Sequence, residues 1–295
     1  MSKIADNEQL GAAQQACRAC NLSHVKPLFV LENNRVLRCL ECGHTYLDVI
    51  HNSQSIRRMY ENYETGMQFY FQDVDEEVTG NIDAYLKQCR AFCETLQPTP
   101  RLLDVGCGAG ILLARAKAQN FICEGVEICE ALAKSAQERV GCKIHRAFLG
   151  DLNLPDNSFD IVTLYDLIEH LEDPVQEIRH AYRLLHPGGI VFVLTPNNDA
   201  LIRRIAQWSY KLTFHQYQRA LRTLYYSKHL SYFSADSLRG LLHRVGFQVL
   251  RTETRNPEMS RLVLSSAERR AVRAVFGISD RFPSLGGKLL LWAKK

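Results

Sequence analysis

The sequence lacks any hydrophobic run long enough to cross a bilayer. No apolar segment of the 295 residues approaches the ~20 that a transmembrane helix needs. Residues 1–16, MSKIADNEQLGAAQQA, also lack the apolar stretch of a signal peptide. We therefore expect a cytoplasmic protein without a membrane span or a secretory leader. Internal repeats and low-complexity tracts are absent as well.

A strong excess of charge of one sign is lacking too. The formal net charge of +4 is modest for 295 residues, so it does not by itself indicate a nucleic-acid or membrane partner. Ten cysteines are many for a cytosolic chain, but six are scattered between Cys89 and Cys142, and none follows Cys142. This distribution disfavours a secreted disulfide framework. We interpret Cys89, Cys93 and Cys107 as small buried side chains.

Two C-x-x-C pairs near the N-terminus predict a metal site. The stretches CRAC and CLEC are separated by 18 residues and supply Cys17, Cys20, Cys39 and Cys42. Zn²⁺ prefers four tetrahedral thiolate ligands, and a two-residue gap lets both thiolates of a pair point at one ion. A site closed by four cysteines has a structural role. Two pairs of free thiols in a small β unit are the alternative.

The residues around the cysteine pairs agree with a small β unit. Asn21 and Gly43 follow the two pairs, and both residue types tolerate the left-handed backbone that a tight knuckle needs. The segments VKPLFVL and RVLRC are expected to pair as a hairpin. His44 is expected to be an exposed loop residue rather than a ligand.

Strands and helices alternate through the rest of the chain. A helix over 77–97 with i, i+3, i+4 apolar spacing precedes this alternation. Strict alternation predicts a doubly wound, mostly parallel sheet with helices on both faces. The expected strands are 101–105, 121–128, 142–149, 159–166, 190–196, 246–254 and an edge strand over 288–295, and the expected helices between them are 110–119, 129–139, 174–185 and 236–245.

The first strand ends in a glycine-rich turn, LLDVGCGAG. Its glycines, Gly106, Gly108 and Gly110, have G-x-G-x-G spacing, and Ile111 stands where a dinucleotide fingerprint has its third glycine. No Gly-Lys-Ser/Thr follows, which excludes a Walker A loop. Asp104 would repel a pyrophosphate and suits a cofactor that carries a positive amino group.

This turn resembles motif I of the class I S-adenosylmethionine-dependent methyltransferases. The segments GVE, GDLNLPDNSFDIVTLYDLIEHLEDP, LLHPGGIVFVLTPN and HLSYFSADSLRGLLHRVGFQVL continue the resemblance over about residues 77–254. The resemblance implies a seven-stranded Rossmann-like sheet and S-adenosylmethionine as cofactor. The cofactor-binding residues that it implies are Asp104, Gly106, Gly108, Gly110, Glu127 at the ribose hydroxyls, Asp151 and Leu152 at the adenine, and Tyr165 and Asp166 facing the cofactor.

The N-terminal part is similar to the zinc ribbon and linker that precede a subset of these enzymes. That subset acts on sugars, surface glycans and secondary metabolites, which implies a small-molecule or glycan substrate. The usual apolar-Pro ending of the ribbon is replaced here by LDVIHN. The expected organisation is a flexible N-terminus (1–16), a zinc ribbon (17–50), a linker or cofactor cover (51–76) and a methyltransferase domain (77–295).

Two other functions stay open at this point. Zinc ribbons also precede rRNA guanine methyltransferases, where they grip RNA. The ribbon here mixes Arg and Lys with Glu and Asp, which makes RNA the less favoured partner. A non-enzymatic adaptor that only senses S-adenosylmethionine is the other alternative.

Candidate catalytic residues follow the fourth strand in the stretch DLIEH. The carboxyl end of the sheet is where open α/β proteins bind ligands. His170 is our first candidate for a general base because histidine titrates near neutral pH. Asp166, Glu169 and His170 form a D-x-x-E-H set that resembles the Mg²⁺-binding E-x-x-E-H set of small-RNA 3′-end and some quinone-pathway methyltransferases. The alternative is that Glu169 and His170 only stabilise the loop. His229 is a further catalytic candidate.

Residues 200–230 contain no Asp or Glu, but six Lys or Arg and six aromatic residues. We expect one or two lid helices whose rings line the substrate pocket and whose cations meet an acidic group of the acceptor. A basic amphipathic helix lying on the inner face of a membrane, near a lipid-linked acceptor, is the second interpretation. A helical hairpin with a solvated basic face is the third.

Overall fold

The structure is a computed structural model that describes most of the chain. The described residues are 16–31, 34–48, 75–94, 98–213, 218–225, 229–262 and 265–295. The expected flexible N-terminus and the expected linker over 51–76 lie almost wholly outside them.

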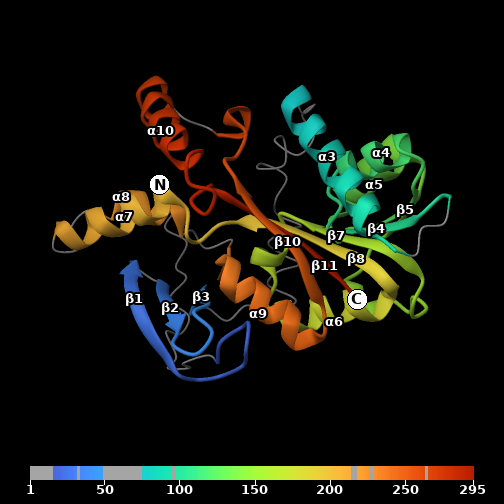
Figure 1. The fold of residues 1–295 in the computed structure, drawn as a ribbon, viewed down its shortest axis with the longest axis horizontal. Helices are drawn as coiled ribbons and strands as arrows, with labels where there is room; N and C mark the ends of the chain where they lie inside the picture. The colour runs from blue at the N-terminus through green and yellow to red at the C-terminus, as the bar shows by residue number, and fades with distance from the viewer. Residues whose placement is uncertain are drawn as a thin grey trace, which may run out of the picture.

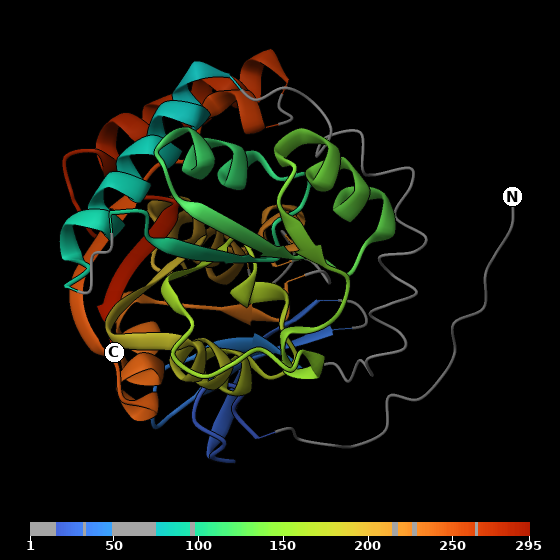
Figure 2. The same cartoon turned by 90° about the vertical axis from the view of Figure 1, so that its right-hand side faces the viewer.

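A seven-stranded sheet forms the centre of the larger part of the chain (Figures 1 and 2). Its strand order is β10-β11-β8-β7-β4-β5-β6, with β8, β7, β4, β5 and β6 parallel and β10 and β11 antiparallel. The predicted doubly wound, mostly parallel sheet is therefore confirmed. The strands are β4 (Arg101–Val105), β5 (Ile122–Val126), β6 (Lys143–His145), β7 (Phe159–Tyr165), β8 (Leu185–Pro196), β10 (Gln248–Arg255) and β11 (Lys288–Lys294).

Helices cover both faces of this sheet (Figure 2). One layer contains α3 (Glu76–Phe92), α4 (Ile111–Ala118) and α5 (Glu130–Val140), and the other contains α6 (Pro174–Leu184) and α9 (Ala235–Val245). Short polar residues begin several of these helices. Asp75 and Asp173 each accept a hydrogen bond from a first-turn amide, and Ser234 forms a capping box with Ser237.

The prediction that the last strand lies at an edge is wrong. β11 is hydrogen-bonded to β8 on one side and to β10 on the other, so β10 rather than β11 forms this edge of the sheet. The five residues Leu289–Ala293 are all buried. An unbroken apolar run of this kind buries side chains on both faces of a sheet, which an edge strand does not require.

The N-terminal segment forms a second sheet that is completed by a distant strand. β1 (Val25–Leu31) and β2 (Asn34–Cys39) form the predicted hairpin, and β3 (Thr45–Leu47) pairs with β2. β9 (Ser231–Tyr232) then pairs with β3. The ribbon is thus joined by backbone hydrogen bonds to a strand that precedes α9.

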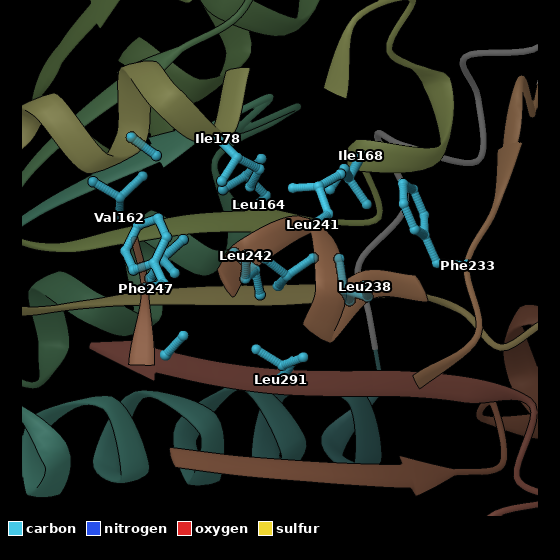
Figure 3. Close-up of a cluster of buried hydrophobic side chains, with 14 of the residues drawn as sticks. Val162, Leu164, Ile168, Ile178, Phe233, Leu238, Leu241, Leu242, Phe247 and Leu291 are labelled. Carbon is cyan, nitrogen blue, oxygen red and sulfur yellow. The ribbon is translucent and has the colours of Figure 1, made fainter. Parts of the chain in front are cut away.

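A continuous core ties the ribbon to the large sheet. Figure 3 shows its central part, a cluster of buried side chains. The cluster includes Leu164 of β7, Ile178 of α6, Leu241 of α9 and Leu291 of β11. The same cluster of buried side chains includes Cys17, Ala19, Leu37, Cys39 and Tyr46 of the ribbon. Burying a leucine side chain contributes about 1.5–3 kcal/mol, so this shared core couples the two parts energetically.

His44 departs from its expected position. Its side chain is fully buried, lies 4.4 Å from the Phe233 ring centroid, and its Nε2 is 3.2 Å from Ser231 Oγ. Burial lowers the pKa of His44 to about 3, because desolvation penalises the charged imidazole. The expectation of an exposed loop histidine is wrong, because the pairing of β3 with β9 covers this position.

Residues 200–230 contain two helices, α7 (Leu201–Leu212) and α8 (Arg219–Leu224). Tyr210 and Tyr225 pack edge-on against Phe29 of the ribbon hairpin, with centroid distances of 5.9 and 5.1 Å. These two rings therefore belong to the core between α7, α8 and the ribbon, rather than to a substrate pocket. Trp208 is exposed. The other three aromatic residues of the segment, Phe214, Tyr217 and Tyr226, lie outside the described residues.

The last helix, α10 (Ser266–Ser279), packs against α7 and precedes β11. Within the part of the chain that the structure describes, no helix combines the length and the hydrophobicity that a membrane crossing requires.

Candidate cofactor and active site

The glycine-rich turn lies at the carboxyl end of β4 and is held by the end of β5. The amides of Gly106 and Cys107 donate to the carbonyl of Val126 at 2.8 and 3.0 Å. Gly108 N donates to Glu127 Oε2 at 3.0 Å, and Cys129 N donates to Glu127 Oε1 at 2.8 Å. Glu127 is therefore bound to the turn itself. Burial raises the pKa of the Glu127 carboxyl, while these amide hydrogen bonds oppose the shift.

The three glycines are required for different reasons. All three have left-handed backbone, with φ of 71°, 52° and 79° at Gly106, Gly108 and Gly110. An added Cβ would lie 2.8 Å from Leu167 at position 106 and 3.0 Å from Ala136 at position 110. At position 108 it would meet no heavy atom within 4 Å. Protein packing explains the first and third glycines, whereas the space above Gly108 is open to a ligand.

Asp104 is a buried carboxylate beneath this turn. Its Oδ1 accepts a 2.6 Å hydrogen bond from Thr163 Oγ1 of the neighbouring strand β7. Burial raises the pKa of Asp104 to about 7, the Thr163 hydrogen bond opposes the shift, and the charge of Glu127 adds to it. The position of Thr163 cannot be predicted from the sequence, because only the parallel pairing of β4 and β7 places it beside Asp104.

The loop after β7 carries the other predicted cofactor contacts. Tyr165 ends β7, and Asp166 follows with φ of 50°. Lys288 Nζ lies 3.4 Å from Asp166 Oδ2 and 3.7 Å from Glu258 Oε2. The contact of Lys288 was not predicted, because Lys288 begins β11, the strand expected at an edge of the sheet. Asp151 and Leu152 lie apart from this loop, in and after a short 3-10 helix (Leu149–Asp151) that follows β6.

The three candidate catalytic side chains lie together. One ligand atom from each of Glu169, His170 and His229 lies within 4.8 Å of the other two. The rings of His170 and His229 meet edge to face at 4.7 Å between centroids. The hydrogen bond from Leu230 N to Glu169 O, at 2.7 Å, helps to bring the two distant segments together.

Glu169 and His229 have strongly shifted pKa values. Burial, reinforced by the charge of Asp166, raises the pKa of Glu169 to about 8. Glu169 Oε2 accepts a 2.9 Å hydrogen bond from Thr195. Burial lowers the pKa of His229 to about 2, and electrostatic interaction with His170 and Arg203 adds to the shift. His229 is therefore a neutral ring at physiological pH.

The four N-terminal cysteines form a compact group. Cys17 Sγ is 3.5 Å from Cys42 Sγ, and Cys20 Sγ is 3.6 Å from Cys39 Sγ. All four sulfur atoms lie within 4.8 Å of one another. Ligands about 2.3 Å from a tetrahedral zinc ion have a similar sulfur spacing, so these residues fit that metal. Gly43 and Asn21 have the expected left-handed backbone, with φ of 71° and 61°. None of the ten cysteines, all of which lie in the described residues, forms a disulfide.

Comparisons with known proteins agree with this fold. A family model described as a methyltransferase domain matches residues 70–252. A ubiquinone biosynthesis O-methyltransferase of Pseudomonas putida is 34% identical over 106 residues, which cover 34% of this chain and 45% of that protein. The matched segment thus spans less than half the length of this relative.

Two solved structures share the fold at low sequence identity. The 1,6-didemethyltoxoflavin-N1-methyltransferase of Burkholderia thailandensis has a TM-score of 0.55 and 14% identity, with 92% of this chain and 99% of that chain covered. Magnesium protoporphyrin IX methyltransferase of Synechocystis PCC 6803, solved with bound S-adenosylmethionine, has a TM-score of 0.53 and 14% identity, with 84% and 99% covered.

The seven-stranded sheet and the glycine-rich turn thus define a class I S-adenosylmethionine-dependent methyltransferase fold. The chain belongs to the methyltransferase-domain family. Membership of this family supports S-adenosylmethionine as the cofactor.

The raised pKa of Asp104 predicts pH-dependent cofactor binding. S-adenosylmethionine is positively charged, so it should bind better when Asp104 is ionised. A carboxyl that titrates near 7 in the free protein should make the dissociation constant about tenfold larger at pH 6 than at pH 8. Calorimetric titration across this range measures the effect.

Two variants separate Asp104 from other titrating groups. Asp104→Asn should bind weakly with a flattened pH profile, and Thr163→Val should move the midpoint to higher pH because the stabilising hydrogen bond is lost. If the dissociation constant of Asp104→Asn varied with pH as it does in the wild type, the pH dependence would come from another group.

Proposed function

We propose that this chain transfers the methyl group of S-adenosylmethionine to a small-molecule, sugar, glycan or lipid-linked acceptor. The observation that carries the proposal is the open space at Gly108, which lies beside the carboxylate of Glu127 at the carboxyl edge of the sheet. A small-molecule acceptor is supported by the relatives named for ubiquinone biosynthesis. The cofactor-binding residues in this proposal are Asp104, Gly106, Gly108, Gly110, Glu127, Asp151, Leu152, Tyr165 and Asp166.

The reaction requires positioning and, for a hydroxyl or amine acceptor, removal of a proton. The acceptor atom attacks the methyl carbon in line, the carbon–sulfur bond breaks with its electron pair moving to sulfur, and S-adenosylhomocysteine leaves. We propose that His170 takes up the proton that the acceptor hydroxyl or amine loses. His229, held neutral by burial, serves to orient the His170 ring. Glu169 positions the same loop through its hydrogen bond with Thr195.

A divalent cation at this group stays a prediction. The sequence pointed to Asp166, Glu169 and His170 for Mg²⁺, whereas the clustered side chains are those of Glu169, His170 and His229. One oxygen of Glu169 already accepts from Thr195, which leaves the other for a metal. A bound cation would position a vicinal diol and lower its pKa.

Replacing His170 by alanine should lower the methyl-transfer rate about 100- to 1000-fold, the range expected for loss of a general base. S-adenosylmethionine affinity should stay within about twofold, because His170 is not a proposed cofactor contact. Initial rates across a pH series measure the effect, and the limb assigned to the base should disappear. His243→Ala, at an exposed position of α9, is the matched control. Full activity of His170→Ala would exclude its role as base.

The acceptor class can be tested with labelled S-adenosylmethionine offered separately to glycan, lipid and RNA fractions. Label in the glycan, lipid or small-molecule fraction is the expected result. Label in RNA alone would overturn the proposed acceptor class, and binding of S-adenosylmethionine without transfer to any fraction would favour the adaptor alternative.

The cations of the ribbon also make RNA a less favoured binding partner. Arg18 makes a contact within the protein, because its Nη1 donates a hydrogen bond to the carbonyl of Glu172 at 2.8 Å. Arg35 forms an ion pair with Asp48. RNA binding relies on many cations that can reach phosphates, so the contact of Arg18 with Glu172 removes one of the few cations of the ribbon.

We assign Cys17, Cys20, Cys39 and Cys42 to a structural Zn²⁺. The spacing of their sulfur atoms and the left-handed residues after each pair support this assignment. The ion would hold the hairpin against the core that Cys17 and Cys39 share with α9 and β11.

A further inference from the structure

Helix α7 has an apolar face that the rest of the described structure does not cover. Ile205, Trp208 and Leu212 have exposed fractions of 45%, 68% and 79%. These residues recur at intervals of three and four, which places them on one side of the helix. Most other exposed large hydrophobic side chains of the described residues are dispersed singly, which needs no special explanation. A contiguous exposed stripe of this kind indicates a binding surface.

The opposite face of α7 already accounts for its packing within the molecule. Arg203, Ala206 and Tyr210 are buried, and they face the ribbon hairpin and α8. Trp208 and its neighbours are therefore not needed to hold the helix in place. Figure 1 shows α7 and α8 extending away from the large sheet, at the left of the view.

Positive side chains flank the exposed tryptophan. At roughly 100° of rotation per residue, Trp208 lies in the middle of the exposed face, with Arg204 and Lys211 on one side of it and Leu212 and Ile205 on the other. Arg204 lies 3.7 Å from Asp199, a half-exposed pair that a stronger anion can replace. Residues 200–230 contain no acidic side chain at all.

The helix that packs against α7 also ends in exposed apolar side chains. Ile278 and Phe282, at the end of α10 and just after it, are 52% and 54% exposed. Arg281 is exposed beside Phe282. α10 combines three arginines with Glu268, and Asp280 follows it, whereas α7 and α8 contain no acidic residue.

We propose that the exposed face of α7 binds the surface of an anionic lipid bilayer. A central tryptophan, aliphatic side chains on one flank and cations on the other are the features of a helix that lies in the membrane interface. The apolar side chains would enter the headgroup boundary, and the long Arg and Lys side chains would reach the phosphates. A protein partner is less well matched, because the centre of a protein interface is depleted of charge, especially lysine.

The helix that carries this surface starts at the functional edge of the sheet. α7 begins shortly after Pro196, the last residue of β8, so it starts at the same carboxyl edge as the glycine-rich turn. The inference stands without the proposed methyl transfer, because lipid binding can be measured without any acceptor.

The two tryptophans of the chain allow a direct test. Trp292 is 2% exposed, so a vesicle-induced shift of the emission maximum reports on Trp208. Full-length protein is mixed with vesicles of equimolar phosphatidylcholine and phosphatidylglycerol, or of phosphatidylcholine alone. We expect a blue shift and co-sedimentation with the anionic vesicles, and binding at least ~10-fold weaker to the neutral ones.

Matched variants identify the surface. Trp208→Glu and the pair Arg204→Glu with Lys211→Glu should each weaken binding at least ~10-fold. Ile122→Glu, at a residue that is 50% exposed on β5, and the pair Lys134→Glu with Lys143→Glu should bind as wild type. Circular dichroism and the melting temperature check that each variant is folded.

Three results would overturn the proposal. These are an unchanged emission maximum with no co-sedimentation, equal binding to neutral and anionic vesicles, and binding that the control variants reduce as much as the α7 variants. Self-association that Trp208→Glu abolishes, in protein that ignores vesicles, would assign the face to a second copy of the chain instead.

Discussion

Gly108→Val should abolish binding of S-adenosylmethionine while the protein remains folded. A Cβ at position 108 would meet no heavy atom within 4 Å beyond its chain neighbours, so the new side chain would enter the space that we assign to the cofactor. The left-handed φ of 52° adds roughly 1–2 kcal/mol of strain. We expect the affinity to fall at least ~100-fold, which corresponds to about 2.7 kcal/mol. Calorimetry and the melting temperature measure binding and stability separately.

Gly141→Val is the matched control for this experiment. Gly141 has a φ of 65° at the end of α5, and a Cβ there would meet only Lys117 Nζ, at 3.9 Å. This variant carries the same backbone strain but lies outside the glycine-rich turn, so it should bind the cofactor normally. Normal binding by Gly108→Val, or equal loss in both variants, would contradict the assignment of the turn.

Substitution of Cys39 by serine should remove the metal and strongly destabilise the protein. Cys39 is fully buried and belongs both to the thiol group and to the core shared with the large sheet. Structural zinc sites in small peptides contribute about 10–16 kcal/mol of apparent binding energy at neutral pH. Loss of even half of that should lower the melting temperature by more than ~10 °C in a chain of this size.

Metal analysis by mass spectrometry tests the same substitution directly. We expect one zinc per chain in the wild type and none in Cys39→Ser. Cys142→Ser, at a half-buried cysteine outside the group of four, should retain the metal. Stoichiometric zinc in Cys39→Ser, or a wild type without zinc, would contradict the site.

Because β9 pairs with β3, the effect should extend beyond the ribbon. The amide of Leu47 donates to the carbonyl of Leu230, and Leu230 N donates in turn to Glu169 O. Metal loss should therefore weaken the loop that holds the candidate catalytic residues as well. A thermal transition that shifts as a whole, rather than splitting in two, is the expected signature.

Features that depend on short spacings could be predicted from the sequence. Each C-x-x-C pair needs only its own backbone to point two thiolates at one place, and Asn21 and Gly43 supply the left-handed turns. The glycine-rich turn is likewise local, since its glycines and the strand before it are consecutive. The alternation of strand and helix then determined the doubly wound sheet, because parallel strands require a crossover between them.

Features that depend on contacts between distant segments were decided only by the tertiary structure. His44 is buried because β9, a two-residue strand distant in the sequence, covers it. Lys288 reaches Asp166 because β11 lies between β8 and β10. The meeting of Glu169, His170 and His229 has the same origin. The periodicity of apolar residues indicates which face of a helix or strand is buried, but not which other element it packs against. That partner is determined by tertiary packing.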